Sequence, residues 1–178
     1  MKSKLLYLLL LPLALVSCEK GGIYKNFQFE YTFKATVPSN ALISSPFFPL
    51  SFAEESNSEA QFEVNDTRKD LVDEMHVNSF LLEVESPQGE DMSFLNSAYF
   101  YINADAEPEV RVAYKESVPS DVGNDLLFDL DDVDLAPYIR AEQGFSIRSK
   151  VVTDENRTQD ITLKGTVKFD VRAQVLGE

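Results

Sequence analysis

Apolar and polar residues take turns along two long stretches of this chain. Residues 160–175 carry apolar side chains at every second position, with Gly165 as the one interruption. Residues 27–36 follow the same rule, with Phe27, Phe29, Tyr31, Phe33 and Ala35 on one side. Because successive side chains of a strand point to opposite faces, each stretch predicts a strand with one face on a core and the other in water. Gly165 predicts a bulge or a bend.

Shorter stretches of the same kind lie between these two, at residues 61–65, 77–85, 97–103, 109–114, 125–130 and 144–152. About eight strands with polar turns predict an all-β fold, in which two antiparallel sheets form a β-sandwich of the Ig-like or Greek-key type. A closed barrel is the alternative. Two short helices are expected, one over 66–75 with Asp66 or Thr67 as its cap, and one within 132–140.

The first 18 residues have the layout of a secretory signal peptide. Lys2 and Lys4 precede an apolar run over 5–16, and small Ser17 precedes Cys18. A membrane-spanning helix needs roughly 20 apolar residues, so this run is too short to span a bilayer. The pattern therefore predicts export rather than a transmembrane anchor.

The residues Leu15-Val16-Ser17-Cys18 resemble the lipobox of bacterial lipoproteins. The resemblance implies that a diacylglyceryl group is attached to Cys18, that the signal is cut just before it, and that the new amino terminus is usually acylated. One acyl chain alone binds a membrane only marginally, at about 0.8 kcal/mol per buried methylene, whereas two or three chains give a lasting hold. An ordinary signal peptide with an incidental cysteine is the alternative.

This interpretation divides the chain into a signal peptide over 1–17, a lipidated cysteine and tether over 18–26, and a single β-sandwich domain over 27–178. It places the protein outside the cytoplasm, in the cell envelope, anchored by acyl chains (palmitate among them) to the outer membrane, with the leaflet left open. Residues 132–171 add a resemblance to small β-sandwich envelope lipoproteins of unknown function. That resemblance implies no catalytic residue.

Charge and cysteine content narrow the possible partners. The chain has 16 Lys and Arg against 30 Asp and Glu, a formal net charge of −14. Loss of the signal peptide, with its two lysines, would make the charge −16. Such an acidic surface repels phosphate backbones and argues against nucleic acid as a partner. Cys18 is the only cysteine, so no disulfide forms within the chain.

Two aromatic pairs are candidate binding residues. Phe47 and Phe48 stand between two prolines, where they could grip a partner or instead fold over the end of the sandwich. Tyr99 and Tyr101 alternate with apolar residues, so their strand is expected to be central and covered on both faces. A sugar-binding platform is the functional alternative for these tyrosines.

Acidic residues offer a weak candidate for a metal site. Asp129, Asp131, Asp132 and Asp134 lie close together in the sequence, and calcium takes six to eight oxygen ligands. The stretch lacks the glycine and the distal glutamate of a calcium loop, so solvated acids at a strand end are the simpler interpretation. No metal and no cofactor are predicted.

The sequence shows no recognisable catalytic motif. His76 is the only histidine, which leaves neither a usual zinc set nor a triad with a base beside a nucleophile. Two acids at a set separation would still allow a carboxylate hydrolase. The leading hypothesis is a non-catalytic envelope module that binds a protein partner or assembles into a larger structure. The alternative is a lipoprotein that binds a glycan or a small apolar ligand.

Overall fold

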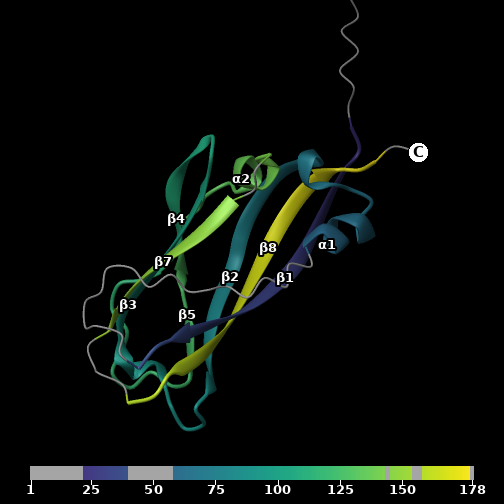
Figure 1. Cartoon of the computed structure of the whole chain (residues 1–178). Helices are drawn as coiled ribbons and strands as arrows, with labels where there is room; N and C mark the ends of the chain where they lie inside the picture. Colours follow the sequence, from purple (N-terminus) through teal and green to yellow (C-terminus); the bar gives the residue numbers. More distant parts are fainter. Residues whose placement is uncertain (1–21, 40–57, 143–144, 154–157, 177–178) are drawn as a thin grey trace, which may run out of the picture.

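The computed structural model describes residues 22–39, 58–142, 145–153 and 158–176. Two four-stranded antiparallel sheets pack face to face (Figure 1), with strand orders β1-β8-β2-β5 and β6-β4-β3-β7. The strands are β1 (Tyr24–Val37), β2 (Val72–Ser86), β3 (Leu95–Ala104), β4 (Glu107–Lys115), β5 (Asp125–Leu127), β6 (Asp129–Leu130), β7 (Phe145–Thr153) and β8 (Ile161–Gln174). The short helices are α1 (Ser58–Val64) and α2 (Ala136–Arg140), with 3-10 turns η1 (Lys69–Leu71) and η2 (Met92–Phe94). The predicted β-sandwich is confirmed, and the closed barrel is not formed.

The last strand, β8, organises the first sheet. It pairs along its whole length with β1 on one side and with β2 on the other. In both β1 and β8 the apolar positions predicted to share a face are the buried or partly buried ones, and the intervening positions are more exposed. The alternation in the sequence therefore corresponds to the inner and outer faces of the sheet.

Gly165 has a different role from the predicted bulge or bend. The β1–β8 register runs without a shift, and Phe33 lies directly opposite Gly165. A Cβ atom at position 165 would lie 2.1 Å from Cζ of Phe33. The glycine thus provides the space in which this buried ring rests on the neighbouring strand.

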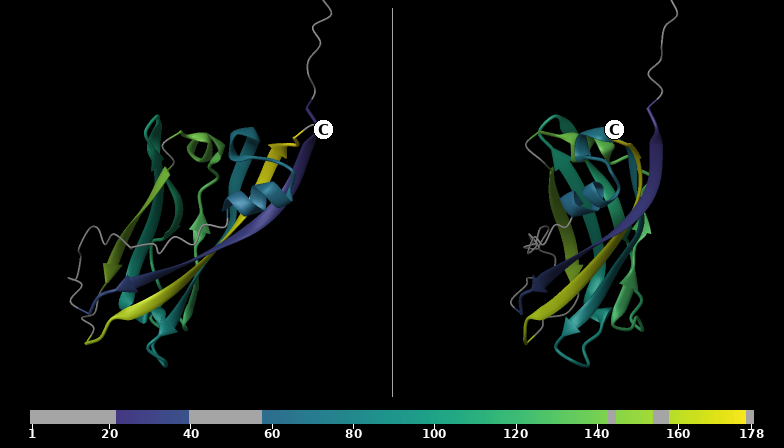
Figure 2. Two further views of the ribbon diagram at one scale, coloured as in Figure 1. Left: turned by 45° about the vertical axis from the view of Figure 1, so that its right-hand side comes forward. Right: turned by 90° about the vertical axis from the view of Figure 1, so that its right-hand side faces the viewer.

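Aromatic rings join the two sheets across the core. The Phe80 ring of β2 lies 4.5 Å, centroid to centroid, from Phe100 of β3 and 5.0 Å from Phe128. Phe128 lies between β5 and β6, where the chain leaves one sheet for the other, and its N–H donates to the Phe80 carbonyl at 2.9 Å. This crossing splits the single strand predicted over 125–130 into two. Figure 2 shows the two layers from the side.

The helix predicted over 66–75 is wrong. Only η1 forms there, and β2 begins at Val72, opposite Ala173 of β8. The hydroxyl of Thr67, expected to cap a helix, instead donates to the Gln174 carbonyl at 2.7 Å. Pairing with β8 buries Val72 and Met75, and this burial overrides the local capping signal.

The strand predicted over 61–65 is also wrong, because these residues lie in and just after α1. Phe62 anchors the helix, and its ring makes edge contacts with Phe27 and Phe29 at centroid distances of 6.2 and 5.9 Å. Two apolar residues over five positions suit one helical turn as well as a short strand. The short helix expected within 132–140 is confirmed as α2.

Gly165→Ala should lower the free energy of unfolding by about 1–3 kcal/mol, the usual cost of forcing extra volume into a packed core. In a Phe33→Leu background the same substitution should cost clearly less, because the ring that would clash is gone. Chemical denaturation of the four variants measures both costs. An equal cost in both backgrounds would show that the Phe33 ring does not rest on Gly165.

Candidate functional site

The outer face of the second sheet carries a row of tyrosines. Tyr99 and Tyr101 lie on β3, and the β3–β4 register places Tyr114 directly opposite Tyr99. All three are partly exposed. Tyr114 completes the row, although its position in the sequence gave no sign of it, because only the pairing of β3 with β4 brings it there. We call Tyr99, Tyr101 and Tyr114 the tyrosine row.

Basic side chains from the neighbouring strands lie over these rings. The Arg111 guanidinium carbon lies 3.8 Å from the centroid of the Tyr114 ring. From β7, Lys150 Nζ lies 5.6 Å from the Tyr99 centroid, and the Arg148 guanidinium carbon lies 5.4 Å from the Tyr101 centroid. These are cation–π distances. The strand is central, as predicted, and among the described residues its outer face is covered by cations.

Carboxylates fix two of the three cations in place. Arg111 donates two hydrogen bonds to Asp131, from Nε at 2.6 Å and from Nη2 at 3.1 Å. Arg148 makes a similar two-bond contact with Glu109 on β4, with Nε to Oε2 at 2.7 Å. The hydrogen bonds from Arg111 lower the pKa of Asp131 below its ordinary value, and the same bonds raise the pKa of Arg111.

The tyrosine row can therefore bind a sugar only if the cations move. A sugar ring stacks on the face of an aromatic ring, and here three cations lie at cation–π distance from the rings, two of them held by carboxylates. Among the described residues, the tyrosine row is thus already covered by basic side chains.

The four acids of the 129–134 segment do not converge on one point. Asp129 pairs with Lys115 at 3.3 Å, and Asp131 pairs with Arg111 as described above. Asp134 accepts hydrogen bonds from the N–H groups of Met75 at 3.0 Å and Ala136 at 2.9 Å, so it fixes the start of α2. In the part of the chain that the structure describes, no three His, Cys, Asp or Glu side chains are grouped to hold a metal ion.

The remaining acid of that segment, Asp132, approaches His76. Its Oδ1 lies 3.2 Å from His76 Nδ1, within ion-pair distance but without the alignment of a hydrogen bond. Asp132 is almost fully exposed, at 97 % of its side chain. His76 lies within β2 rather than at its start, on the outer face of the first sheet.

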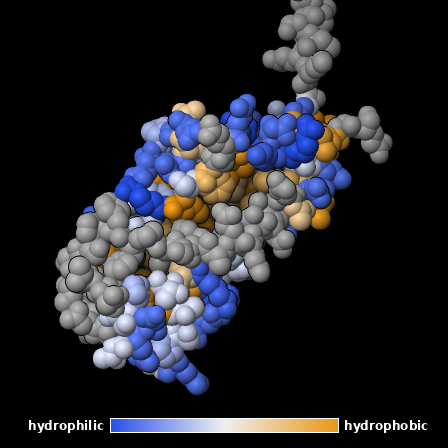
Figure 3. Space-filling view, viewed as in Figure 1, coloured by the Kyte–Doolittle hydropathy of each residue, from blue (hydrophilic) through white to orange (hydrophobic). Residues whose placement is uncertain are grey.

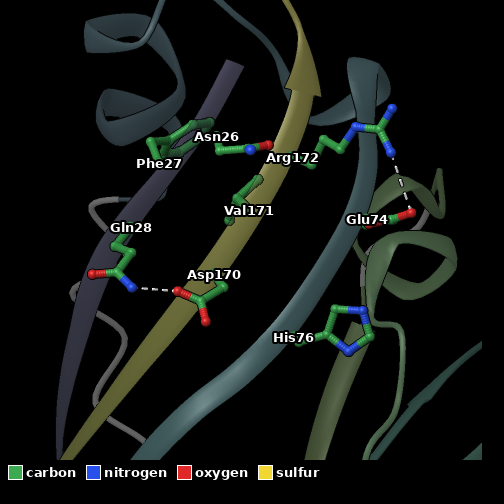
Figure 4. A pocket seen from close by; sticks show the side chains of 8 residues that line it. All are labelled: Asn26, Phe27, Gln28, Glu74, His76, Asp170, Val171 and Arg172. Atoms are coloured by element: carbon green, nitrogen blue, oxygen red, sulfur yellow. Dashed lines mark hydrogen bonds and ion pairs between the residues drawn. The ribbon is translucent and has the colours of Figure 1, made fainter. Parts of the chain in front are cut away.

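A shallow depression of about 410 Å³ lies on that outer face (Figure 4). Six of its lining residues belong to β1 and β8, and Glu74 and His76 belong to β2. Asp170 accepts hydrogen bonds from Gln28 and from Asn78, while Arg172 Nη1 lies 3.4 Å from Glu74 Oε1. Asp170, Glu74 and Arg172 are therefore already paired, whereas His76 Nδ1 has no hydrogen-bond partner among the described residues. Nothing in this arrangement places a nucleophile beside a base.

Ion pairs cover the rest of this face. Lys164 and Lys168 of β8 lie 3.3 Å from Glu83 and 3.7 Å from Glu30, and Lys34 of β1 lies 2.6 Å from Glu85. Exposed pairs of this kind contribute little stability each. Their consequence is a flat, charged surface suited to water.

Two predicted site segments lie outside the described residues. These are Cys18, the expected lipid attachment site, and the Phe47–Phe48 pair. Lipidation of Cys18 and partner binding by Phe47 and Phe48 therefore stay predictions.

No protein family matches the chain, and no curated protein matches it. Among the described residues, no helix has the length and apolar character needed to cross a bilayer. Two features therefore bear on function: the sequence motif at the amino terminus and the geometry of the sandwich.

Asp131→Asn should lower the free energy of unfolding at neutral pH by about 1 kcal/mol or less, since this pair is partly exposed. The hydrogen bonds from Arg111 hold the pKa of Asp131 in the folded protein below that of an ordinary aspartate, so the stabilisation is present above the ordinary pKa and is lost as the pH falls through the folded-state pKa.

Urea denaturation from neutral to strongly acid pH measures this effect. The difference in the free energy of unfolding between Asp131→Asn and the unmodified protein should disappear in strong acid. Asp105→Asn, at the exposed β3–β4 turn, is the matched control and should change nothing. A gap that stays constant from neutral to strongly acid pH would contradict the role assigned to the Arg111 contact.

Proposed function

We propose that this protein is a non-catalytic, lipid-anchored module of the bacterial cell envelope, which binds a protein partner or joins a larger assembly. Acyl chains on Cys18 would anchor it, and the outer membrane is the expected location. The anchor rests on the lipobox resemblance. The binding role rests on the shape of the sandwich, and above all on its first strand.

The observation that carries the binding role is the position of β1. It is 14 residues long and lies at the edge of its sheet, and among the described strands it pairs with β8 alone. Long, regular edge strands offer backbone N–H and C=O groups to a strand of another chain. Residues 24–30 are the part of this edge that we assign to a partner.

The rest of the described surface supports a binding module over an enzyme. The interior is filled by apolar side chains, including Phe94 and Phe100 at 0 % exposure. The outer depression is shallow, its acids Asp170 and Glu74 are already paired, and its described lining places no nucleophile beside His76, which supports a binding role over hydrolysis.

A glycan-binding lipoprotein is the second candidate, and the tyrosine row is the observation that favours it. Three tyrosines on one sheet face, flanked by Arg148 and Lys150, would suit an acidic glycan. The cations already cover the rings, and for this reason we place it second.

Cys18→Ala should remove the protein from the membrane fraction of a bacterial host that processes lipoproteins. The reason is that the thiol is the only attachment point for the diacylglyceryl group. Radiolabelled palmitate should mark the unmodified protein and not the variant. Persistent labelling of Cys18→Ala would show that the anchor is elsewhere.

A photo-cross-linking residue placed at Glu30, on β1, should capture a discrete protein partner when the acylated form is irradiated in intact cells. The same residue at Asp105, exposed but on the β3–β4 turn of the other sheet, is the control and should capture much less. Equal capture at both positions, or none at Glu30, would argue against β1 as the binding edge.

A further inference from the structure

We propose that one end of the sandwich rests on the membrane surface through three exposed apolar side chains, Ile23, Val64 and Leu176. We call these residues the apolar end. The proposal rests on the acylation of Cys18 proposed above, and it adds the orientation of the domain and the chemistry of the surface that it contacts.

The apolar end is assembled from three separate segments. The N–H of Val175, after β8, donates to the Ile23 carbonyl at 2.8 Å, and the N–H of Leu176 donates to the Asp66 carbonyl at 2.8 Å. Asp66 lies two residues beyond Val64, the last residue of α1. These hydrogen bonds bring the start of β1, the end of β8 and the end of α1 together, as Figure 1 also shows.

The three side chains are unusually open for apolar residues. Ile23 is 77 % exposed, Val64 is 76 % exposed and Leu176 is 43 % exposed. Figure 3 shows orange, apolar surface at this end, beside the last described residues of the chain. Single exposed apolar residues are ordinary, but three brought together by a tertiary contact indicate a surface that meets something apolar.

The short tether between Cys18 and Ile23 indicates that the surface which the apolar end contacts is a bilayer. Ile23 lies five positions after Cys18, and five extended residues reach about 17 Å at most. An acylated Cys18 lies at the level of the lipid headgroups. Ile23 is therefore held within that distance of the membrane surface, and so is the apolar end to which it belongs.

Charge at this end also suits the approach. Segments 22–25, 63–70 and 174–176 carry three basic and three acidic residues, which cancel, in a chain with a formal charge of −14. Lys25, Arg68 and Lys69 supply the positive charges. Because the end has no net charge, it approaches a lipid surface without the repulsion expected of the acidic body.

The test uses the scarcity of thiols in this chain. In the acylated protein Cys18 is consumed by its lipid, so a cysteine introduced by Val64→Cys is the only free thiol and takes a nitroxide label. Gln88→Cys is the control, because Gln88 is also exposed but follows Ser86, at the end of β2 that pairs with the start of β8.

On phosphatidylcholine vesicles, the Val64 label should be several-fold more accessible to oxygen, and less accessible to a water-soluble nickel relaxation agent, than the Gln88 label. Adding Ile23→Asp should return the Val64 label to water. Adding Leu127→Asp, which charges a residue that is 59 % exposed on β5, should not.

The results of this experiment distinguish failure of the membrane contact from failure of the lipid anchor on Cys18. Protein that fails to float with the vesicles would overturn the lipid anchor and the membrane contact together. Protein that floats with both labels in water would overturn the membrane contact alone. The Cys18→Ala form without vesicles is the reference, and a Val64 label already shielded there would assign the apolar end to a second copy of the chain instead.

Discussion

Packing of apolar side chains between the two sheets is the interaction on which the rest of this structure depends. The chain has one cysteine and so no internal disulfide, and its exposed ion pairs contribute little each. The inner faces of the sheets therefore supply most of the stability. There Phe80, Phe100 and Phe128 join the layers, and Phe33 rests on Gly165. The outer faces are then free to carry the paired charges that keep an acidic protein in solution.

Long alternating stretches were predictable from the sequence, whereas short ones were not. β1 and β8 are each 14 residues long, and most of each alternates between apolar and polar residues, a pattern typical of a half-buried strand. The segment 61–65 is too short for periodicity to separate strand from helix. At 66–75, Asp66 and Thr67 are residue types that favour the start of a helix, but pairing of Val72 with β8 outweighs this local preference. The division of 125–130 depends on where the chain crosses between sheets, which no local pattern encodes.

Site prediction met the same limit. Tyr99 and Tyr101 were identified by their alternation, but Tyr114 joins them only through the register of β3 with β4, and the cations over the rings come from β4 and β7. Adjacent acids in the 129–134 segment suggested a shared ligand, yet Asp131 pairs with Arg111 while Asp134 accepts from the N–H groups of Met75 and Ala136. Closeness in the sequence says little about convergence when successive strand residues point to opposite faces.

Among the described residues, both outer faces of the sandwich carry paired charges, while β1 lies at a sheet edge and Ile23, Val64 and Leu176 are exposed at one end. Because β1 begins at this end, the proposed lipid anchor and the proposed binding edge lie in one region. Mass spectrometry of the protein extracted from bacterial membranes gives the sharpest test of the proposed anchor. We expect a mature chain that begins at Cys18 and carries a diacylglyceryl group on it. A chain that begins elsewhere, or an unmodified Cys18, would contradict it.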